Sequence, residues 1–227
     1  MGSEATRHEQ PYTIVDAFTS EIFRGNPAAV VVLSEPLSDE TMQLIAREFN
    51  LSETAFLHSL PQNDTGPDTL AYTLRWMTPT VEVKLCGHAT LASAKSLFLS
   101  QDETIKTLVF KTLHSGTLKA TKCQDGKIQL EFPAGEIAPV SERVHGDLVL
   151  MLKKALGSDV LILQISSGLG ISFDDFLLVE IDTNVGLSNL EVNIGALVSD
   201  NHKQCTFCSY DRVSGGHTTL DRNHRYF

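Results

Sequence analysis

Residues 50–60 read NLSETAFLHSL and, after a polar loop, residues 70–94 read LAYTLRWMTPTVEVKLCGHATLASA. Glu53 lies in the first stretch, inside an otherwise apolar run. A carboxyl group in apolar surroundings has a raised pKa, which suits a group that takes and returns protons near neutral pH. The same position also fits a carboxylate at a strand end that turns to water. Composition alone favours neither interpretation.

Cys86, Gly87 and His88 stand where a predicted strand (residues 81–85) gives way to a predicted helix (residues 89–99). A helix start of this kind offers backbone N–H groups and an imidazole to an anionic substrate. A thiol at a helix N-terminus has a lowered pKa and can act as an acid, a base or a nucleophile. A packed or capping histidine and a small buried cysteine are the structural alternatives.

The predicted helix at residues 89–99 is apolar nearly all round, because Lys95 is its only charged residue. Such helices are buried on most sides. Predicted strands lie on both sides of it in the sequence, at residues 12–18, 28–33, 70–76, 105–113, 117–121 and 127–132. We therefore expect an α+β fold in which a sheet wraps a central helix. A second, amphipathic helix is predicted from the N-cap Ser38 to Asn50, which ends it in the left-handed conformation.

A junction marked by proline and glycine at residues 133–139 opens a second segment. It contains a predicted amphipathic helix that ends at Gly157, and strands near residues 160–165, 176–181 and 194–199. Residues 200–227 are polar and show no clear periodicity. We therefore divide the chain into domains at residues 11–135 and 136–227.

The overall composition limits the classes of partner. The net charge is −10, which argues against a nucleic acid held by phosphate contacts. Four scattered cysteines are too few for a disulfide framework and favour a reducing compartment, the cytoplasm. No uncharged apolar run is long enough to span a membrane.

Two further groups of residues contain side chains that can form a site. Asp16 and Asn26 are predicted to approach each other across a hairpin, with turn and edge chemistry as the alternative. Cys205 and Cys208, together with His217 and His224, resemble a zinc site only loosely, because the spacing between the ligand pairs does not fit. We expect no structural metal there.

Four stretches occur in order and at matching spacing: VDAFTSEIFRGNPAAVVVL (15–33), IAREFNLSETAFL (45–57), LRWMTPTVEV (74–83) and LCGHATLASA (85–94). Together they resemble the PhzF-type phenazine-biosynthesis-like family, and most closely its animal members, the MAWD-binding proteins. The resemblance covers residues 11–135 and weakens afterwards. It implies a diaminopimelate epimerase-like fold with two similar halves, each a sheet rolled around a central helix, and a site between them.

The resemblance also implies roles for single residues. Glu53 takes the place of the catalytic glutamate, which moves a proton between carbon atoms of one substrate. Gly87 and His88 position that substrate, and the helix start beside them attracts its carboxylate. Asp16 and Asn26 line or support the same pocket. The implied enzyme is a cofactor-independent isomerase of a small carboxylate-bearing metabolite, and a homodimer and a WD-repeat protein partner are expected by the same resemblance.

The resemblance also bears on Cys86, which stands where epimerase relatives use a catalytic cysteine, although PhzF-type members do not depend on one. One feature departs from the family pattern. In relatives a stretch like EDPVTGSAH follows RYF and begins the second central helix, whereas here RYF occupies residues 225–227. We therefore expect an incomplete second half, with Phe176, Leu178 and Val179 lacking a full packing partner. A catalytically inactive protein-interaction module on the same fold is the alternative function.

Overall fold

The computed structural model describes residues 10–61, 66–170, 173, 176–182, 190–197, 204–209 and 225–226. Its contacts divide the chain into two compact units, Met1–Pro133 and Ala134–Phe227, each described by itself below. None of the described helices is both long and apolar enough to cross a membrane.

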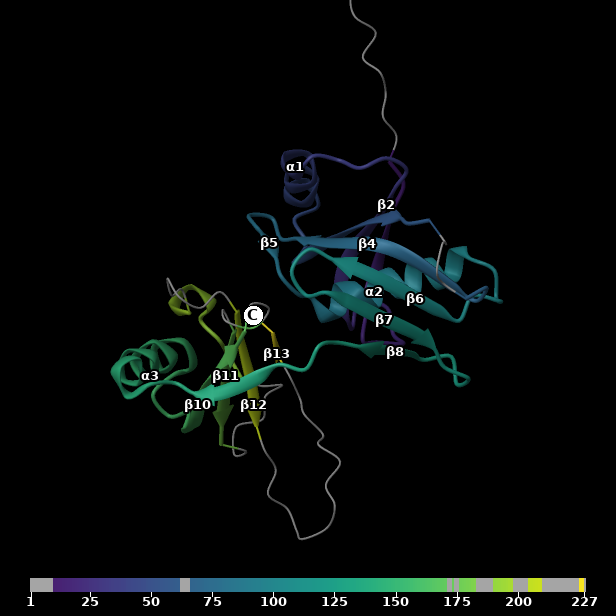
Figure 1. Cartoon of the computed structure of the whole chain (residues 1–227). Helices are drawn as coiled ribbons and strands as arrows, with labels where there is room; N and C mark the ends of the chain where they lie inside the picture. The colour runs from purple at the N-terminus through teal and green to yellow at the C-terminus, as the bar shows by residue number, and fades with distance from the viewer. Residues whose placement is uncertain are drawn as a thin grey trace, which may run out of the picture. The chain divides into compact units, whose positions relative to one another are not determined.

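The first unit contains one eight-stranded sheet and two helices (Figure 1). Its strands are β1 (Tyr12–Ala17), β2 (Asn26–Leu33), β3 (Glu53–Ser59), β4 (Thr69–Met77), β5 (Glu82–Val83), β6 (Thr107–Thr112), β7 (Thr117–Lys122) and β8 (Ile128–Glu131). The helices α1 (Asp39–Phe49) and α2 (Gly87–Ser100) each lie in a connection between two parallel strands. The sheet order is β1-β2-β3-β4-β6-β7-β8, and β5 pairs with β4.

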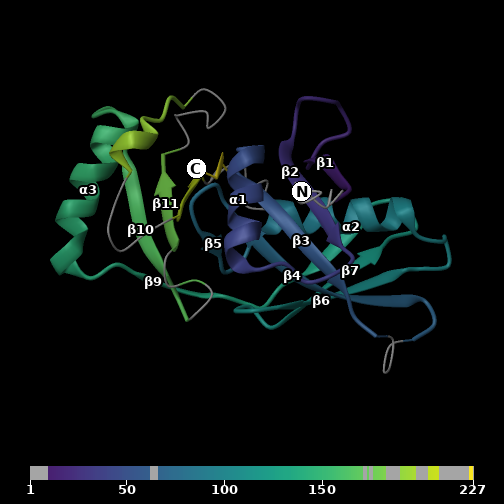
Figure 2. The same cartoon turned by 90° about the horizontal axis from the view of Figure 1, so that it is seen from above.

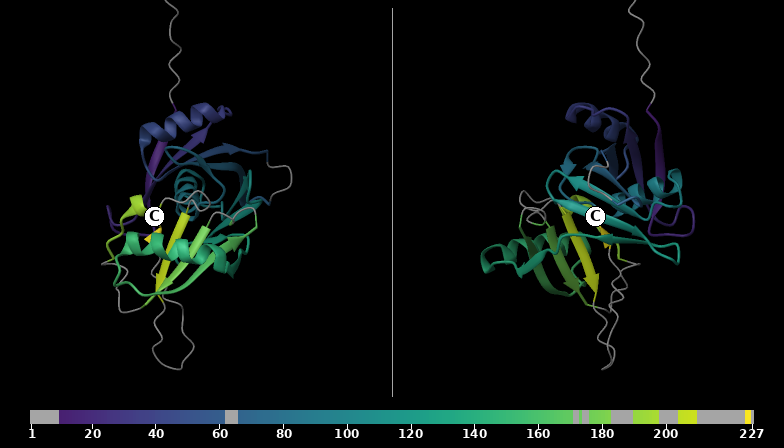
Figure 3. Two further views of the ribbon diagram at one scale, coloured as in Figure 1. Left: turned by 90° about the vertical axis from the view of Figure 1, so that its left-hand side faces the viewer. Right: turned by 45° about the vertical axis from the view of Figure 1, so that its right-hand side comes forward.

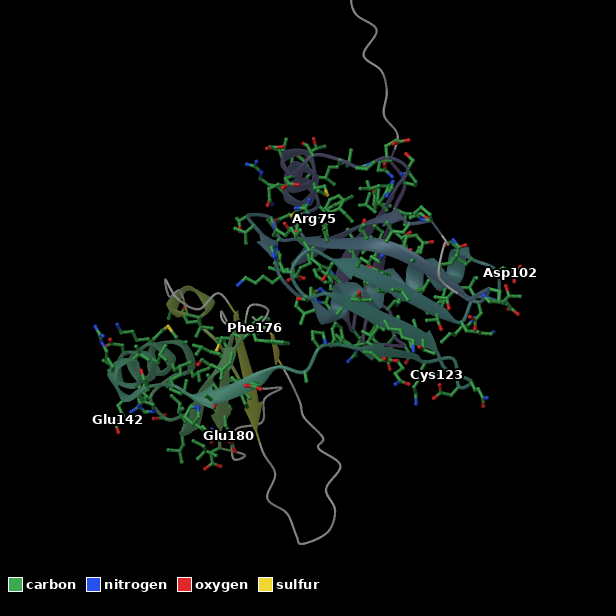
Figure 4. All side chains as sticks on the ribbon, in the orientation of Figure 1. Arg75, Asp102, Cys123, Glu142, Phe176 and Glu180 are labelled. Carbon is green, nitrogen blue, oxygen red and sulfur yellow. The ribbon has the colours of Figure 1, made fainter. Side chains whose placement is uncertain are left out.

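Helix α2 is the centre of this unit. It contacts β1 and β8, the two edge strands, as well as β2, β3 and β7. A sheet whose two edges both reach one helix is strongly curled, and the left view of Figure 3 shows the strands curving around α2. Its buried residues are Ala89, Thr90, Ala92, Ser93, Ala94, Leu97 and Phe98. The predicted α+β class and the sheet around a buried helix are confirmed.

Helix α1 packs against the outer face of the sheet. Met42 and Ala46 form a small core there with residues of β2, β3 and β4, namely Val31, Leu33, Phe56 and Met77. The Ser38 side chain accepts a hydrogen bond from the Thr41 backbone N–H at 3.2 Å. Asn50 ends the helix with φ 51°. Both predicted caps are confirmed.

The second unit contains a five-stranded sheet in the order β13-β12-β11-β10-β9. The strands are β9 (Glu136–Pro139), β10 (Ile162–Leu169), β11 (Phe176–Ile181), β12 (Gln204–Ser209) and β13 (Arg225–Tyr226). The strand predicted at residues 194–199 is wrong, because Ile194–Ala196 forms a short 3₁₀ helix. In contrast, β12 and β13 lie within residues 200–227, where the sequence shows no clear hydrophobic periodicity and predicts no strand.

Helix α3 (Glu142–Leu156) covers one face of this sheet, and Figure 2 shows it beside β10. The core between them includes Leu148, Leu152, Leu156, Ile165, Leu177 and Val179. The expectation that Val179 lacks a packing partner is therefore wrong. Phe176 and Leu178 alternate with the buried residues of β11, so they lie on the face away from α3 and are half-buried.

Candidate functional site

Glu53 is placed by the junction between α1 and β3. The left-handed Asn50 ends the helix, and the chain turns at once into β3, which Glu53 begins. Alternation along the strand puts Glu53 on the same face as Ala55 and Leu57, which pack in the core around α2. The carboxyl therefore points to the concave side of the curled sheet.

His88 meets Glu53 at the start of α2. Its Nε2 atom lies 3.2 Å from Glu53 Oε2 and 3.2 Å from Ser52 Oγ. The His88 side chain is 10% exposed and the Glu53 side chain is 16% exposed. Residues 35 positions apart in the sequence thus form one nearly buried contact.

Cys86 completes the group from the other side of the ring. Its Sγ atom lies 3.4 Å from His88 Nδ1, so the imidazole stands between a thiol and a carboxyl, with one ring nitrogen toward each. Cys86 is the N-cap residue of α2, and its carbonyl accepts hydrogen bonds from the backbone N–H and the hydroxyl of Thr90.

Burial shifts the acid–base properties of the Glu53–His88 pair. It raises the pKa of Glu53, and the hydrogen bond from Ser52 offsets part of that rise. It also lowers the pKa of His88 to about 4. Both shifts disfavour the imidazolium–carboxylate pair, so the 3.2 Å approach joins a carboxyl to a neutral imidazole rather than two charges. Within the described residues, Glu53 Oε2 has no well-aligned hydrogen-bond partner.

Of the two interpretations of Cys86, the structure supports the small buried cysteine and not the thiol with a lowered pKa. Burial raises the pKa of its thiol, and the charge of Glu53 raises it further. Backbone N–H groups of Ala89 and His88 act in the opposite direction, as the helix start predicts, but they are outweighed. The group therefore remains a thiol rather than a thiolate near neutral pH.

Glu53, Cys86 and His88 also form a group with metal-ligand chemistry among the described residues, since one ligand atom from each lies within 4.8 Å of the others. Their close contacts use opposite ring nitrogens, however: Nδ1 faces the thiol and Nε2 faces the carboxyl. A shared ion would need one nitrogen that faces the same point as both other ligands. The arrangement fits a chain of hydrogen bonds better than a metal centre.

Asp16 and Asn26 lie at neighbouring register positions of β1 and β2, but their side chains fall on opposite faces of the sheet. Asn26 pairs with Ala17, one register step away from the predicted approach, while Asp16 pairs with Pro27. Alternation places Asn26 on the face that carries Ala28 and packs toward α2, and it places Asp16 on the opposite face. The Asp16 carboxyl instead lies beside Gly25, where an added Cβ would come within 2.9 Å of its Oδ1.

Gly87 leaves open space beside His88. A Cβ added at Gly87 would meet no atom within 4 Å, and its φ is not in the left-handed region. Neither the backbone nor packing against the described residues therefore requires glycine here. The space adjoins the backbone N–H groups of the first turn of α2, which contains no acidic residue.

Sequence reasoning missed two side chains of this region. Ser52 contacts the His88 ring, and its position next to Glu53 was the available signal. For Trp76, the alternating pattern of residues 70–76 predicts only a place in a half-buried strand. It pairs with Ala55 on β3 and Val83 on β5, it is 2% exposed, and its Nε1 has no hydrogen-bond partner among the described residues.

The proposed absence of zinc near the C-terminus stays a prediction. Cys205 is buried in the core of the second unit, and burial raises its pKa to about 12. The side chain of Cys208 and the whole of His217 and His224 lie outside the described residues.

A family model described as "Phenazine biosynthesis-like protein" matches residues 15–227. The chain belongs to this family. A phenazine biosynthesis-like domain-containing protein of Mus musculus is 48% identical over 147 residues, which cover 65% of this chain and 49% of the relative. An uncharacterized isomerase of Halalkalibacterium halodurans is 40% identical over 196 residues, 82% of this chain and 63% of the relative.

Solved structures of the phenazine biosynthesis-like family agree with the fold. A PhzF family protein of Enterococcus faecalis matches with a TM-score of 0.61 and 33% identity, over 88% of this chain and 68% of that one. A putative PhzC/PhzF protein of Clostridium difficile matches with a TM-score of 0.62 and 28% identity, over 96% of this chain and 73% of that one. The chain spans about half the length of the animal relatives it matches.

Proposed function

We propose that the chain acts as a PhzF-type isomerase in which Glu53 moves a proton within a small carboxylate-bearing metabolite, without a metal or organic cofactor. The observation that carries this proposal is the nearly buried Glu53 carboxyl. Its pKa is raised, and the group lies beside the neutral imidazole of His88. A carboxyl of this kind takes and returns a proton near neutral pH.

The reaction needs one proton and no redox partner. The Glu53 carboxylate removes a proton from one carbon of the substrate, and the electron pair left behind is spread over its adjoining unsaturated or carboxyl group. The same carboxyl returns the proton to another carbon, so the product is an isomer with unchanged composition. His88 is placed to orient Glu53 and the substrate on the concave side of the sheet.

The substrate carboxylate is assigned to the open space at Gly87. Backbone N–H groups at the start of α2 point out of a helix that has no acidic residue in its first turn, and such a helix end favours an anion. The missing side chain at Gly87 lets a ligand approach this backbone. Asn26 lies on the same side of the sheet, and Asp16 is proposed as a supporting residue only.

Deuterium exchange tests the role of Glu53. The chain is incubated in D₂O with a panel of small hydroxy-, amino- and unsaturated dicarboxylic acids, and carbon-bound deuterium is measured by mass spectrometry. Glu53→Gln should reduce incorporation by about 10²–10⁴-fold, whereas Glu48→Gln, an exposed acid on α1, should leave it unchanged. Undiminished incorporation in Glu53→Gln would show that another group moves the proton.

Gly87→Ala tests the site of the carboxylate. Alanine in a helix interior is about 0.5–1 kcal/mol more stable than glycine, a gain that is smaller at the first position of α2, and the added methyl meets no atom within 4 Å. We expect unchanged or raised stability together with a loss of deuterium incorporation. Unchanged incorporation in this variant would show that the substrate carboxylate does not bind at the start of α2.

Two expectations from the resemblance, the homodimer and the WD-repeat partner, remain proposals, as does the cytoplasmic location expected from the few scattered cysteines. Light scattering of the purified chain measures the first, and binding of a purified WD-repeat protein measures the second. The alternative function, an inactive interaction module, is the conclusion if the wild-type chain incorporates no deuterium into any acid of the panel.

A further inference from the structure

The Cys86 thiol has no task in the reaction proposed above, although it is buried within the site. Its Sγ atom lies 3.4 Å from His88 Nδ1. Its backbone is held at the N-cap of α2, where the carbonyl accepts two hydrogen bonds from Thr90. The sulfur is therefore fixed against one nitrogen of the ring while the carboxyl of Glu53 stands against the other.

A neutral imidazole carries a hydrogen on one nitrogen and a lone pair on the other, so two arrangements are open to His88. In the first, the thiol donates to Nδ1 and the ring N–H on Nε2 donates to Ser52 Oγ, with Glu53 Oε2 at 3.2 Å but not aligned for a hydrogen bond. In the second, Nδ1–H faces the sulfur, a weak acceptor, and the Nε2 lone pair faces the carboxylate. Whenever Glu53 is ionised, as the proposed reaction requires, the second arrangement opposes two electron-rich atoms 3.2 Å apart in a nearly buried place.

We propose that Cys86 is a positioning residue whose thiol donates to Nδ1 of His88 and thereby keeps the ring hydrogen on Nε2, the nitrogen beside Ser52 and Glu53. Burial keeps the thiol protonated, so its hydrogen is available for this contact. The consequence for catalysis rests on the proposed function of Glu53, but the tautomer itself does not.

The tautomer decides where a proton can rest during turnover. With a hydrogen already on Nε2, the ring stabilises the Glu53 carboxylate through its N–H dipole and opposes part of the effect of burial. A proton that Glu53 takes from a substrate then stays on its carboxyl, because the neighbouring nitrogen has no free lone pair. The proton thus remains available for return to another carbon.

Ring-nitrogen NMR of the full chain, labelled with ¹⁵N-histidine, tests the proposal without any substrate. The His88 signals are assigned from their absence in His88→Gln. We expect the Nε2–H tautomer in the wild type and in Cys86→Ser, whose hydroxyl also donates. In Cys86→Ala the preference should fall by roughly threefold, near the low end for one hydrogen bond, because a thiol is a weak donor. Cys123→Ala, a cysteine outside the site, should change nothing.

Three outcomes overturn the proposal: Nδ1–H in the wild type, Nδ1–H in Cys86→Ser, or an unchanged tautomer preference in Cys86→Ala. If Cys86→Ala fails to fold, the wild type and Cys86→Ser still decide. A merely structural role for Cys86 would change stability without changing the tautomer. Failure here leaves the deuterium test of Glu53 intact, and failure of that test leaves the tautomer assignment intact.

Discussion

The two units of this chain cover a sheet with a helix in different ways. In the first, α2 is apolar nearly all round and both edges of a curled sheet contact it. In the second, α3 lays one stripe of residues on one face of its sheet, while its N-cap Ser141 stays exposed. In the first unit, the start of α2 is buried together with Glu53, His88 and Cys86, and this burial shifts the pKa values of all three side chains.

Hydrogen exchange on the full chain should show the largest difference between the units. On the face of the second sheet away from α3, Phe176 and Leu178 are half-buried and Ile137 is 59% exposed. Uncovered apolar area of this kind forfeits several kcal/mol at roughly 25 cal/mol per Å². We expect amides of β10 and β11 to exchange roughly a thousandfold faster than those of α2, a difference in opening free energy of about 4 kcal/mol.

Equal protection of β10, β11 and α2 in a monomer would break this comparison, because it would mean that the second sheet needs no further cover. The measurement is repeated at several protein concentrations. Protection of β10 and β11 that rises with concentration would indicate that a second copy covers the face.

Matched cavity variants sharpen the same difference. Leu97 on α2 and Leu152 on α3 are 1% and 0% exposed. Leucine-to-alanine changes in cores cost about 2–5 kcal/mol, and the cost is highest where the surroundings cannot collapse. Because strands enclose α2, we expect Leu97→Ala near the upper end of this range and Leu152→Ala near the lower end. Denaturant unfolding monitored by signals from each unit measures both, and a reversed order would contradict the argument.

The pH dependence of stability should come mainly from the first unit. The pKa of His88 falls from 6.5 to about 4 on folding, so the unfolded chain binds the proton more readily. This stability is fully present above 6.5 and is lost as pH falls toward about 4, up to about 3 kcal/mol. Compared with the wild type, His88→Gln should lose less stability between about pH 7 and pH 4.

Glu53 contributes with the opposite sign. Its raised pKa gives stability that is present below 4.5 and is lost as pH rises through the folded-state value. Comparison of Glu53→Gln with the wild type isolates this part. His145→Gln on α3 is the control, because that side chain is exposed in the second unit. If the loss of stability at low pH persisted undiminished in His88→Gln, a group other than His88 would be its cause.

Much of the first unit was predictable because its signals are local. The caps Ser38 and Asn50 and the apolar helix from residue 89 each follow from a few neighbouring residues. Glu53 is identifiable as a candidate site residue because a charged group inside an apolar run is costly unless it has a function or an interaction partner. The structure adds that its partner is His88.

The remainder depended on tertiary contacts that no window of sequence contains. The helix start alone predicted a reactive thiol at Cys86, but the curled sheet buries it and reverses the shift of its pKa. Strand β12 escaped detection because polar and apolar residues alternate only over residues 204–207, and it is pairing with β11 that places the strand in the sheet. Register separated Asp16 from Asn26, and a shift of one residue moves a side chain to the other face.

The smallest expected effect concerns the two helix caps. Ser38 Oγ accepts a hydrogen bond from the Thr41 N–H, whereas the Ser141 side chain makes no such bond at the start of α3. Replacing a bonded N-cap serine with alanine costs about 0.5–2 kcal/mol, because a backbone donor loses its partner. We therefore expect Ser38→Ala to lower the free energy of unfolding by about 1 kcal/mol and Ser141→Ala by clearly less. Chemical denaturation of the two variants side by side measures this, and an equal loss in both would show that the difference between the caps has no energetic weight.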